Sequence, residues 1–200
     1  GAQTVEDGPL SLMRIPDMGR WFENIGWVEA PTSAAKWAGR GRWLVFAGSD
    51  RLSDTVLKAL SDAKAEVLCV KVGSEFAAVP GGFSLRPDST EDFDALSQAL
   101  DKMPEHILHL WAIDSETRAH AFDSAYLLAR MLQLSDAGSG VKLTVAATGA
   151  MRVANEDVPS PELATLLGPV RVGPREVPGL TAAFVDMEMG NSAQVQTLLT

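Results

Sequence analysis

The sequence is poor in the residues on which covalent and metal-based sites depend. Its 200 residues include one cysteine, one tyrosine and three histidines. A single cysteine cannot form an internal disulfide, and Cys69 lies in an apolar run, so we expect it to be a small core residue. No run of about 18 apolar residues predicts a transmembrane helix. The first residues lack the basic start and apolar centre of a signal peptide, and a reducing cytoplasmic location is expected.

Positive charge is also scarce. The chain has 17 Lys and Arg against 26 Asp and Glu, which gives a formal net charge of -9. Nucleic acids and anionic membrane surfaces are bound through clusters of basic side chains. We therefore expect neither a nucleic acid nor a membrane as partner. Hydrophobic residues make up 46% of the sequence, which is enough for a substantial core.

The first regular strand is not followed by the glycine pattern that nucleotide binding requires. Residues Trp43–Gly48 (WLVFAG) are typical of the first buried strand of a dinucleotide-binding fold. The glycines of G-x-G-x-x-G make the tight turn after that strand and let the backbone approach the pyrophosphate. Here a single glycine is followed by Ser49 and Asp50, and the Asp50 carboxylate takes the helix N-terminus that would attract a phosphate. We expect no nicotinamide cofactor to bind here.

Apolar strands alternate with amphipathic helices along most of the chain. The predicted strands are Trp43–Ala47, Glu66–Val72, His106–Ile113, Lys142–Ala147 and Leu180–Met187. The predicted helices are Asp50–Ala63, Ser89–Met103, Ala119–Leu134, Pro161–Leu167 and Ser192–Thr200, and 73–87 is expected to be a loop. Near-continuous apolar strands that alternate with helices predict an α/β fold, a doubly wound parallel sheet of Rossmann type covered on both faces.

The segment before this regular pattern is expected to be different. Residues 1–20 are interpreted as a linker or arm, 21–31 as a first strand and 42–200 as the regular α/β core. Arg20–Ala30 (RWFENIGWVEA) concentrates large apolar side chains, and an exposed apolar edge strand is normally covered. We expect a missing domain to cover it, and the isolated chain to self-associate through 20–30 or to leave it mobile. The Gly1-Ala2 start and a helix pattern that reaches Thr200 suggest part of a longer protein.

The histidines do not form a metal site in this pattern. His106 and His109 are three residues apart on one strand and so point to opposite faces, and His120 lies near a helix start. No HxxxH, CxxC or carboxylate cluster accompanies them. We expect structural or surface histidines and no metal.

The remaining catalytic candidates lack partners. A Tyr-x-x-x-Lys pair would indicate a short-chain dehydrogenase, but Tyr126 is followed four residues later by Arg130, whose charge is fixed. Tyr126 also falls on the apolar stripe of its helix and is expected in the core. Thr148 ends a strand where open α/β folds bind ligands, yet no base stands beside it. The tryptophans are expected to serve core or interface packing, and they are Trp21, Trp27, Trp37, Trp43 and Trp111. No catalytic or cofactor-binding residue is assigned.

A series of segments occurs in a recognisable order. They are WVEAP (Trp27–Pro31), GRWLVFA (Gly41–Ala47), EVLCVKVG (Glu66–Gly73), DSTEDFDAL (Asp88–Leu96), ILHLWAID (Ile107–Asp114), FDSAYLLARML (Phe122–Leu132), LTVAATGAMRV (Leu143–Val153) and GPVRVGPREVPGLTAAFVDME (Gly168–Glu188). In this order the chain resembles the structural subdomain of the ketoreductase region in modular type I polyketide synthases, over roughly residues 20–200. That subdomain is a truncated, degenerate short-chain-dehydrogenase fold, and the arm before Trp21 has no counterpart that we can place.

The resemblance implies a non-catalytic role. In the family this half has lost nucleotide binding and packs against a catalytic half that uses NADPH, within a synthase that carries substrates on phosphopantetheine. No catalytic residue is carried over, because the matching half is absent from this sequence. Two alternatives stay open: a stand-alone small-molecule-binding or transferase domain that uses the Thr148 strand edge, and a pseudo-ketoreductase spacer in a synthase module.

Overall fold

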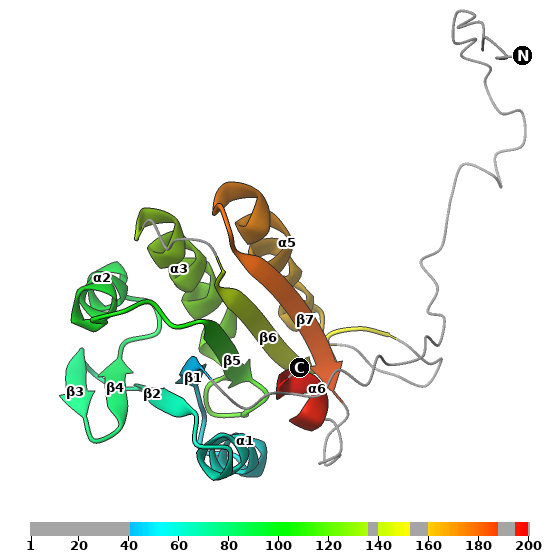
Figure 1. Cartoon of the computed structure of the whole chain (residues 1–200). Helices are drawn as coiled ribbons and strands as arrows, with labels where there is room; N and C mark the ends of the chain where they lie inside the picture. Colours follow the sequence, from blue (N-terminus) through cyan, green and yellow to red (C-terminus); the bar gives the residue numbers. More distant parts are fainter. Residues whose placement is uncertain (1–40, 136–139, 153–159, 188–194, 200) are drawn as a thin grey trace, which may run out of the picture. The chain divides into compact units, whose positions relative to one another are not determined.

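One seven-stranded sheet organises the protein (Figure 1). The computed structural model describes residues 41–135, 140–152, 160–187 and 195–199, all within one compact unit, Ser33–Thr200. The strand order is β3-β4-β2-β1-β5-β6-β7, and every neighbouring pair is parallel except β3 and β4. The α/β fold expected from the sequence is confirmed.

The elements alternate as the sequence pattern predicts. The strands are β1 (Arg42–Phe46), β2 (Glu66–Val72), β3 (Ala77–Val79), β4 (Gly82–Leu85), β5 (His106–Ala112), β6 (Lys142–Thr148) and β7 (Thr181–Met187). The helices are α1 (Arg51–Asp62), α2 (Thr90–Ala99), the single turn η2 (Arg118–His120), α3 (Ala121–Leu134), α4 (Pro161–Ala164), α5 (Leu167–Glu176) and α6 (Val195–Leu199).

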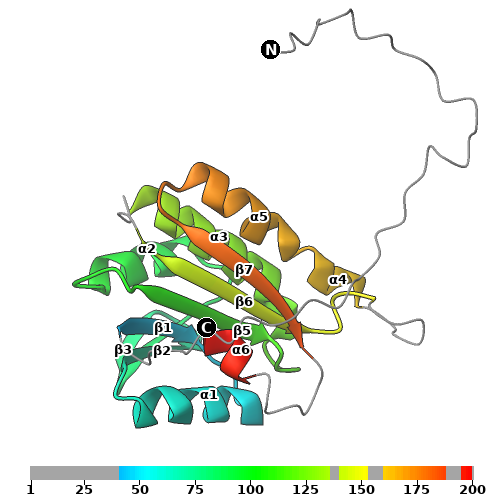
Figure 2. The same ribbon diagram turned by 45° about the vertical axis from the view of Figure 1, so that its right-hand side comes forward.

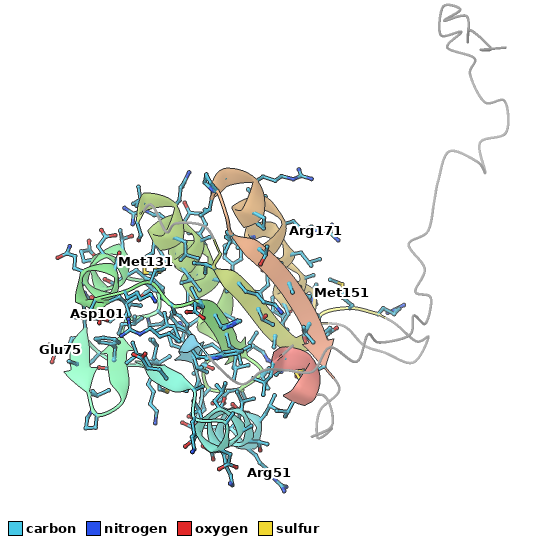
Figure 3. All side chains as sticks on the ribbon, in the orientation of Figure 1. Arg51, Glu75, Asp101, Met131, Met151 and Arg171 are labelled. Atoms are coloured by element: carbon cyan, nitrogen blue, oxygen red, sulfur yellow. The ribbon has the colours of Figure 1, made fainter. Side chains whose placement is uncertain are left out.

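Helices cover both faces of the sheet. Figures 1 and 2 show α2, α3 and α5 on one face and α1 with α6 on the other. Two apolar cores result: one unites Phe46, Trp111 and Met131 beneath α3, and the other unites Val45, Leu60 and Leu198 beside α1. Figure 3 shows how densely side chains fill the space between the sheet and these layers. Burial on both faces explains why β1 and β5 read as continuous apolar runs.

Three regions differ from the sequence-based expectation. The loop expected over 73–87 contains the β3–β4 hairpin, whose β4 pairs parallel with β2. Helix α5 was not predicted beyond 167, although it runs through Pro169 and Pro174. Helix α2 ends at Ala99, earlier than the predicted Met103, because Leu100 already has extended backbone. The expectations for residues 1–40, which include the arm and the strand over 21–31, lie outside the described residues.

Candidate functional site

The fold has one position where a cofactor would be expected, the carboxyl ends of β1 and β5. β2 lies on one side of β1 in the sheet, and β5, β6 and β7 follow on the other side. The order of the strands therefore reverses between β1 and β5. Ligands of open α/β sheets bind at such a reversal of strand order, beside the turn after the first strand. In this protein that turn comprises Gly48, Ser49 and Asp50, which lead into α1.

Asp50 caps α1, as the sequence predicts. Its Oδ1 accepts hydrogen bonds from the amides of Leu52 at 2.8 Å and Ser53 at 3.0 Å. The Ser53 hydroxyl, which is buried, donates to Asp50 Oδ2 and accepts from the Gly48 amide at 3.2 Å. These side chains accept hydrogen bonds from amides that would otherwise donate to a phosphate at the start of a helix.

Asp114, at the end of β5, fills the rest of the turn. Its Oδ2 accepts the Ser49 amide at 2.6 Å, and its Oδ1 accepts the Glu116 amide at 2.9 Å. A Cβ added at Gly48 would stand 2.3 Å from Asp114 Oδ2, so the two residues are in close contact. Four amides of the turn, those of Gly48, Ser49, Leu52 and Ser53, are therefore bound by the chain's own side chains.

Hydrogen bonds across β1 and β5 hold Asp114 in place. The buried Trp111 donates its indole N–H to the Ala47 carbonyl at 3.2 Å. The Thr117 hydroxyl donates to the Trp111 carbonyl at 2.8 Å, and the Asp114 carbonyl accepts the amides of Thr117 and Arg118. The main chain of Asp114 thus supports the segment that leads into η2, while its side chain occupies the turn after β1. Sequence analysis missed this role, because the carboxylate binds an amide that lies 65 residues earlier in the chain.

A second aspartate binds the loop amides beside Thr148. Asp186 of β7 accepts the amides of Ala150 at 3.1 Å and Met151 at 2.7 Å. Thr148 is partly buried at the end of β6, and no side chain among the described residues is hydrogen-bonded to its hydroxyl. The structure therefore brings no base to Thr148 within that part of the chain.

The histidines are separated, as expected. His106 stacks on Trp43 with ring centroids 4.3 Å apart, while His109 lies against Phe46 and Trp111 in the other core. Burial lowers the pKa of His106, and it lowers the pKa of the fully buried His109 to about 3. His120 precedes α3, and its carbonyl accepts the Ser124 hydroxyl. No group of three or more potential metal-ligating side chains occurs within the described residues.

The expected core position of Tyr126 is wrong. Its side chain is 56% exposed, and Phe122, one turn earlier on α3, is 44% exposed. The apolar stripe of α3 is wider than the sheet can cover, so Leu128 and Met131 face the core while these two rings face outward. Arg130 does not face a tyrosine hydroxyl but pairs with Asp94 of α2 at 2.9 Å. Cys69 is half-buried, and burial raises the pKa of its thiol.

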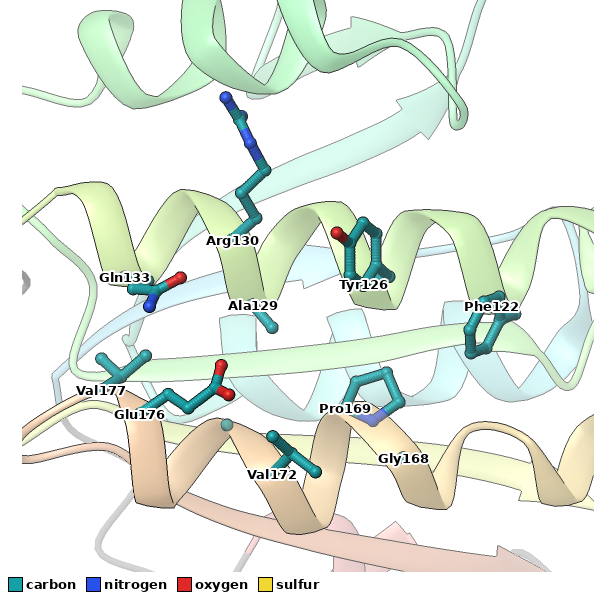
Figure 4. A pocket seen from close by; sticks show the side chains of 11 residues that line it. Phe122, Tyr126, Ala129, Arg130, Gln133, Gly168, Pro169, Val172, Glu176 and Val177 are labelled. Atoms are coloured by element: carbon teal, nitrogen blue, oxygen red, sulfur yellow. The ribbon is translucent and has the colours of Figure 1, made fainter.

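Tyr126 and Phe122 line a groove between α3 and α5. We call this the α3–α5 groove; its volume is about 460 Å³ (Figure 4). The opposite wall includes Pro169 and Val172, and Val172 is 45% exposed. A second hollow of about 550 Å³ shares Phe122 and continues toward Arg118 and Glu162. An exposed apolar surface of this kind typically marks a contact with another protein segment.

A family description and several solved structures match this chain. The family described as "Beta-ketoacyl synthase-like, N-terminal" matches residues 41–128, less than half of the sequence. No curated protein matches the chain in a sequence comparison. Within the described residues, no helix has both the length and the apolar character needed to span a bilayer.

Solved structures with the same fold include assembly-line ketoreductases. A multidomain structure with adenylation, ketoreductase and pseudo-Asub domains, from a keto acid-selecting NRPS module, aligns with a TM-score of 0.72 at 22% identity, over 87% of this chain and 16% of that chain. An N-terminal ketoreductase from the macrolactin assembly line aligns with a TM-score of 0.59 at 19% identity, over 78% and 35%.

A short-chain dehydrogenase/reductase is similar in fold as well. A variant of such an enzyme from Serratia marcescens aligns with a TM-score of 0.52 at 14% identity, over 80% of this chain and 87% of that chain. At these identities the likeness establishes the fold, a short-chain-dehydrogenase-like Rossmann domain. The present chain spans only a small part of the first two structures, and it resembles the ketoreductase regions of modular assembly lines.

Proposed function

We propose that this chain is the non-catalytic structural half of an assembly-line ketoreductase region. In this proposal it supports a catalytic half elsewhere in the parent protein, and that half binds NADPH and reduces a β-keto group on a carrier-bound chain. Phosphopantetheine also belongs to the parent. Two of the solved structures named above motivate this assignment: one contains a ketoreductase within an NRPS module, and the other is a ketoreductase from the macrolactin assembly line.

The observation that carries the proposal is the self-occupied turn after β1. Asp50 and Asp114 bind the amides that would hold a pyrophosphate, and both carboxylates place negative charge where a phosphate would arrive. A dinucleotide would have to displace Asp114 and break its bonds to Ser49 and Glu116. Burying a phosphate beside unpaired carboxylates is strongly unfavourable.

The resulting prediction concerns cofactor binding. Calorimetric titration of the purified chain with NADPH or NADH should give no binding at concentrations where active reductases saturate. A dissociation constant of about 10 μM or tighter, near -7 kcal/mol, would contradict the proposal. The variant Asp50→Ser with Asp114→Ala is the informative comparison. If weak binding emerges only in that variant, the two carboxylates are the cause of exclusion.

The proposal also assigns an occupant to the α3–α5 groove, the helices of the catalytic half. Two helix pairs of α/β domains can pack face to face through such ridges and grooves. The exposed Phe122, Tyr126 and Val172 supply the apolar surface that this packing requires. The assembly-line structure extends far beyond the part that aligns here, so a neighbouring domain is available in relatives of this kind.

A charge placed in the groove should therefore weaken association with the catalytic half. We expect Tyr126→Asp combined with Val172→Asp to reduce affinity at least about tenfold in a two-fragment binding assay, which corresponds to about 1.4 kcal/mol. The matched control is Val79→Asp on β3, which is also an exposed apolar residue. Equal affinity for the groove variant and the control would remove the groove from the proposal, and circular dichroism should report an unchanged fold for both.

The alternative of a small-molecule site at Thr148 has less support. The amides of Ala150 and Met151, which would bind an anionic ligand there, are already bound to Asp186. The spacer alternative predicts the same properties for this chain and differs in that only this half remains in the synthase module.

A further inference from the structure

Strand β7 forms one edge of the sheet, and its outer side has no partner among the described residues (Figure 2). It is seven residues long and pairs with β6 in unbroken register from Thr181 to Met187. The strand at the other edge, β3, has only three residues. Long, regular edge strands invite pairing, and β7 has no lysine, proline or bulge that would discourage it.

The register of β7 identifies its outward backbone groups. The Thr181 amide donates to the Val141 carbonyl, so Thr181 and every second residue after it bond to β6. The amides and carbonyls of Ala182, Phe184 and Asp186 therefore point away from the sheet. These three residues and the two between them are only partly buried, whereas the interior strand β1 is buried along most of its length. The edge thus offers a row of donors and acceptors to whatever lies beside it.

This row of backbone groups is complementary to itself. When a second β7 lies antiparallel beside the first, with a two-fold axis at Phe184, the two Phe184 residues exchange both of their backbone hydrogen bonds. On each side of the axis, Ala182 of one copy exchanges both bonds with Asp186 of the other copy. Every outward amide and carbonyl of both strands is then paired. A register shifted by two residues leaves the outward groups at one end of each strand without a partner in β7.

The side chains of β7 suit the same register. Asp186 is the only charged residue of the strand, and it lies opposite Ala182 rather than opposite a second carboxylate. Like charges directly opposite each other on neighbouring strands destabilise a sheet. The two Phe184 rings meet at the axis, where each covers apolar surface that the core beneath α5 leaves only partly buried.

We propose that the outer edge of β7 is a dimerisation surface, on which a second copy of this chain pairs antiparallel about a two-fold axis at Phe184. A pairing of this kind closes after two copies, because each edge strand is covered by the other. The two sheets then form one continuous sheet, and its only remaining edges are the short β3 strands. The proposal does not depend on the proposed function.

Sedimentation of the full chain over a range of concentrations tests the dimer. We expect a reversible monomer–dimer equilibrium, and Ala182→Pro should raise its dissociation constant at least about tenfold. Proline removes an outward amide and places its ring where the second strand would lie, yet no hydrogen bond to β6 is lost. Val79→Asp, on the other edge strand, is the control and should leave the dissociation constant unchanged. Slow amide exchange in β6 should show that the sheet is folded in each variant.

Opposite charges at one position test the register. Ala182→Lys places an ammonium group opposite the Asp186 carboxylate of the other copy, and Ala182→Asp places a second carboxylate there. We expect Ala182→Asp to dimerise at least about tenfold more weakly than Ala182→Lys, because two such pairs form in each dimer. The same two substitutions at the exposed Thr181, which lies opposite the neutral Met187, are the control for net charge and should differ by less than about twofold.

Three outcomes would overturn the proposal. A chain that stays monomeric at every concentration has an edge that is open or is covered from within the chain. A dimer that Ala182→Pro leaves unchanged uses another surface. Equal weakening by Ala182→Lys and Ala182→Asp would show that the two strands do not meet in this register. Cofactor binding enters none of these readouts, so the proposed function and the dimer can fail independently.

Discussion

Acidification from pH 6.5 to pH 3 should remove about 5 kcal/mol of folding free energy through His109 alone. Burial lowers its pKa from 6.5 to about 3, and no charged side chain contributes to the shift. Below pH 6.5 the unfolded chain binds a proton at this site and the folded chain does not. Stability is therefore full above pH 6.5 and falls by about 1.4 kcal/mol per pH unit until the folded pKa is reached.

The surroundings of His109 explain why it resists protonation. Its Nε2 lies 2.8 Å from the Ser124 hydroxyl, and that hydroxyl donates to the carbonyl of His120. Nε2 must then carry the hydrogen, which leaves the buried Nδ1 as an acceptor without a partner in the described structure. A second proton on Nδ1 would place an unpaired charge between Phe46 and Trp111.

Denaturant titrations across this pH range provide the measurement. His109→Phe should reduce the fall in unfolding free energy between pH 6.5 and pH 3, because the phenyl ring suits the aromatic cluster and cannot titrate. His106→Phe is the matched control, since His106 is only partly buried and should account for far less of the slope. If the unfolding free energy falls equally steeply with decreasing pH in the natural chain and in His109→Phe, other groups govern acid unfolding.

Gly48→Ala should destabilise the fold by about 3 kcal/mol, at the upper end of overpacking effects. The added Cβ would stand 2.3 Å from Asp114 Oδ2 and 2.6 Å from Asp114 Cβ. Asp114 cannot retreat without releasing the Ser49 amide. Chemical denaturation is the measurement, and the natural chain provides the reference.

A double-mutant cycle identifies the cause of this loss. In the Asp114→Gly background, Gly48→Ala should lower the free energy of unfolding only slightly, because the side-chain atoms that the new Cβ would meet are absent. Asp114→Gly is itself destabilising. Gly168→Ala is the control, since nothing lies within 4 Å of its added Cβ and alanine favours the helix by about 0.5–1 kcal/mol. Additive losses at positions 48 and 114 would mean that the close contact is not responsible.

Local signals made part of this structure predictable. The cap at Asp50 depends on residues two and three positions away, and the predicted start of α2 at Ser89 is confirmed by the bond from the Asp92 amide to the Ser89 hydroxyl. Strands such as β1 and β5 were found because burial on both faces leaves a continuous apolar run. The absence of a glycine-rich turn was visible directly in the sequence.

Other features depend on contacts that no local pattern encodes. Helix α5 contains two prolines and two glycines, yet its inner face is buried against the sheet through Val170 and Gly173. Tertiary packing therefore outweighs its weak helix propensity. Asp114 lies 65 residues from the amide of Ser49 that it binds, so its role could not be seen from spacing. Tyr126 was misplaced because an apolar stripe does not reveal which of its residues the sheet will cover.

Asp114 couples the turn after β1 to the segment that leads into η2 and α3. Its carboxylate accepts the amides of Ser49 and Glu116, and its main-chain carbonyl accepts the amides of Thr117 and Arg118. A substitution that removes this carboxylate frees the amides of Ser49 and Glu116 in the same step, while Asp50 still holds the start of α1. Engineering a nucleotide-binding turn here would therefore require changes at Asp114 and Asp50 together, and we expect the change at Asp114 alone to lower the free energy of unfolding.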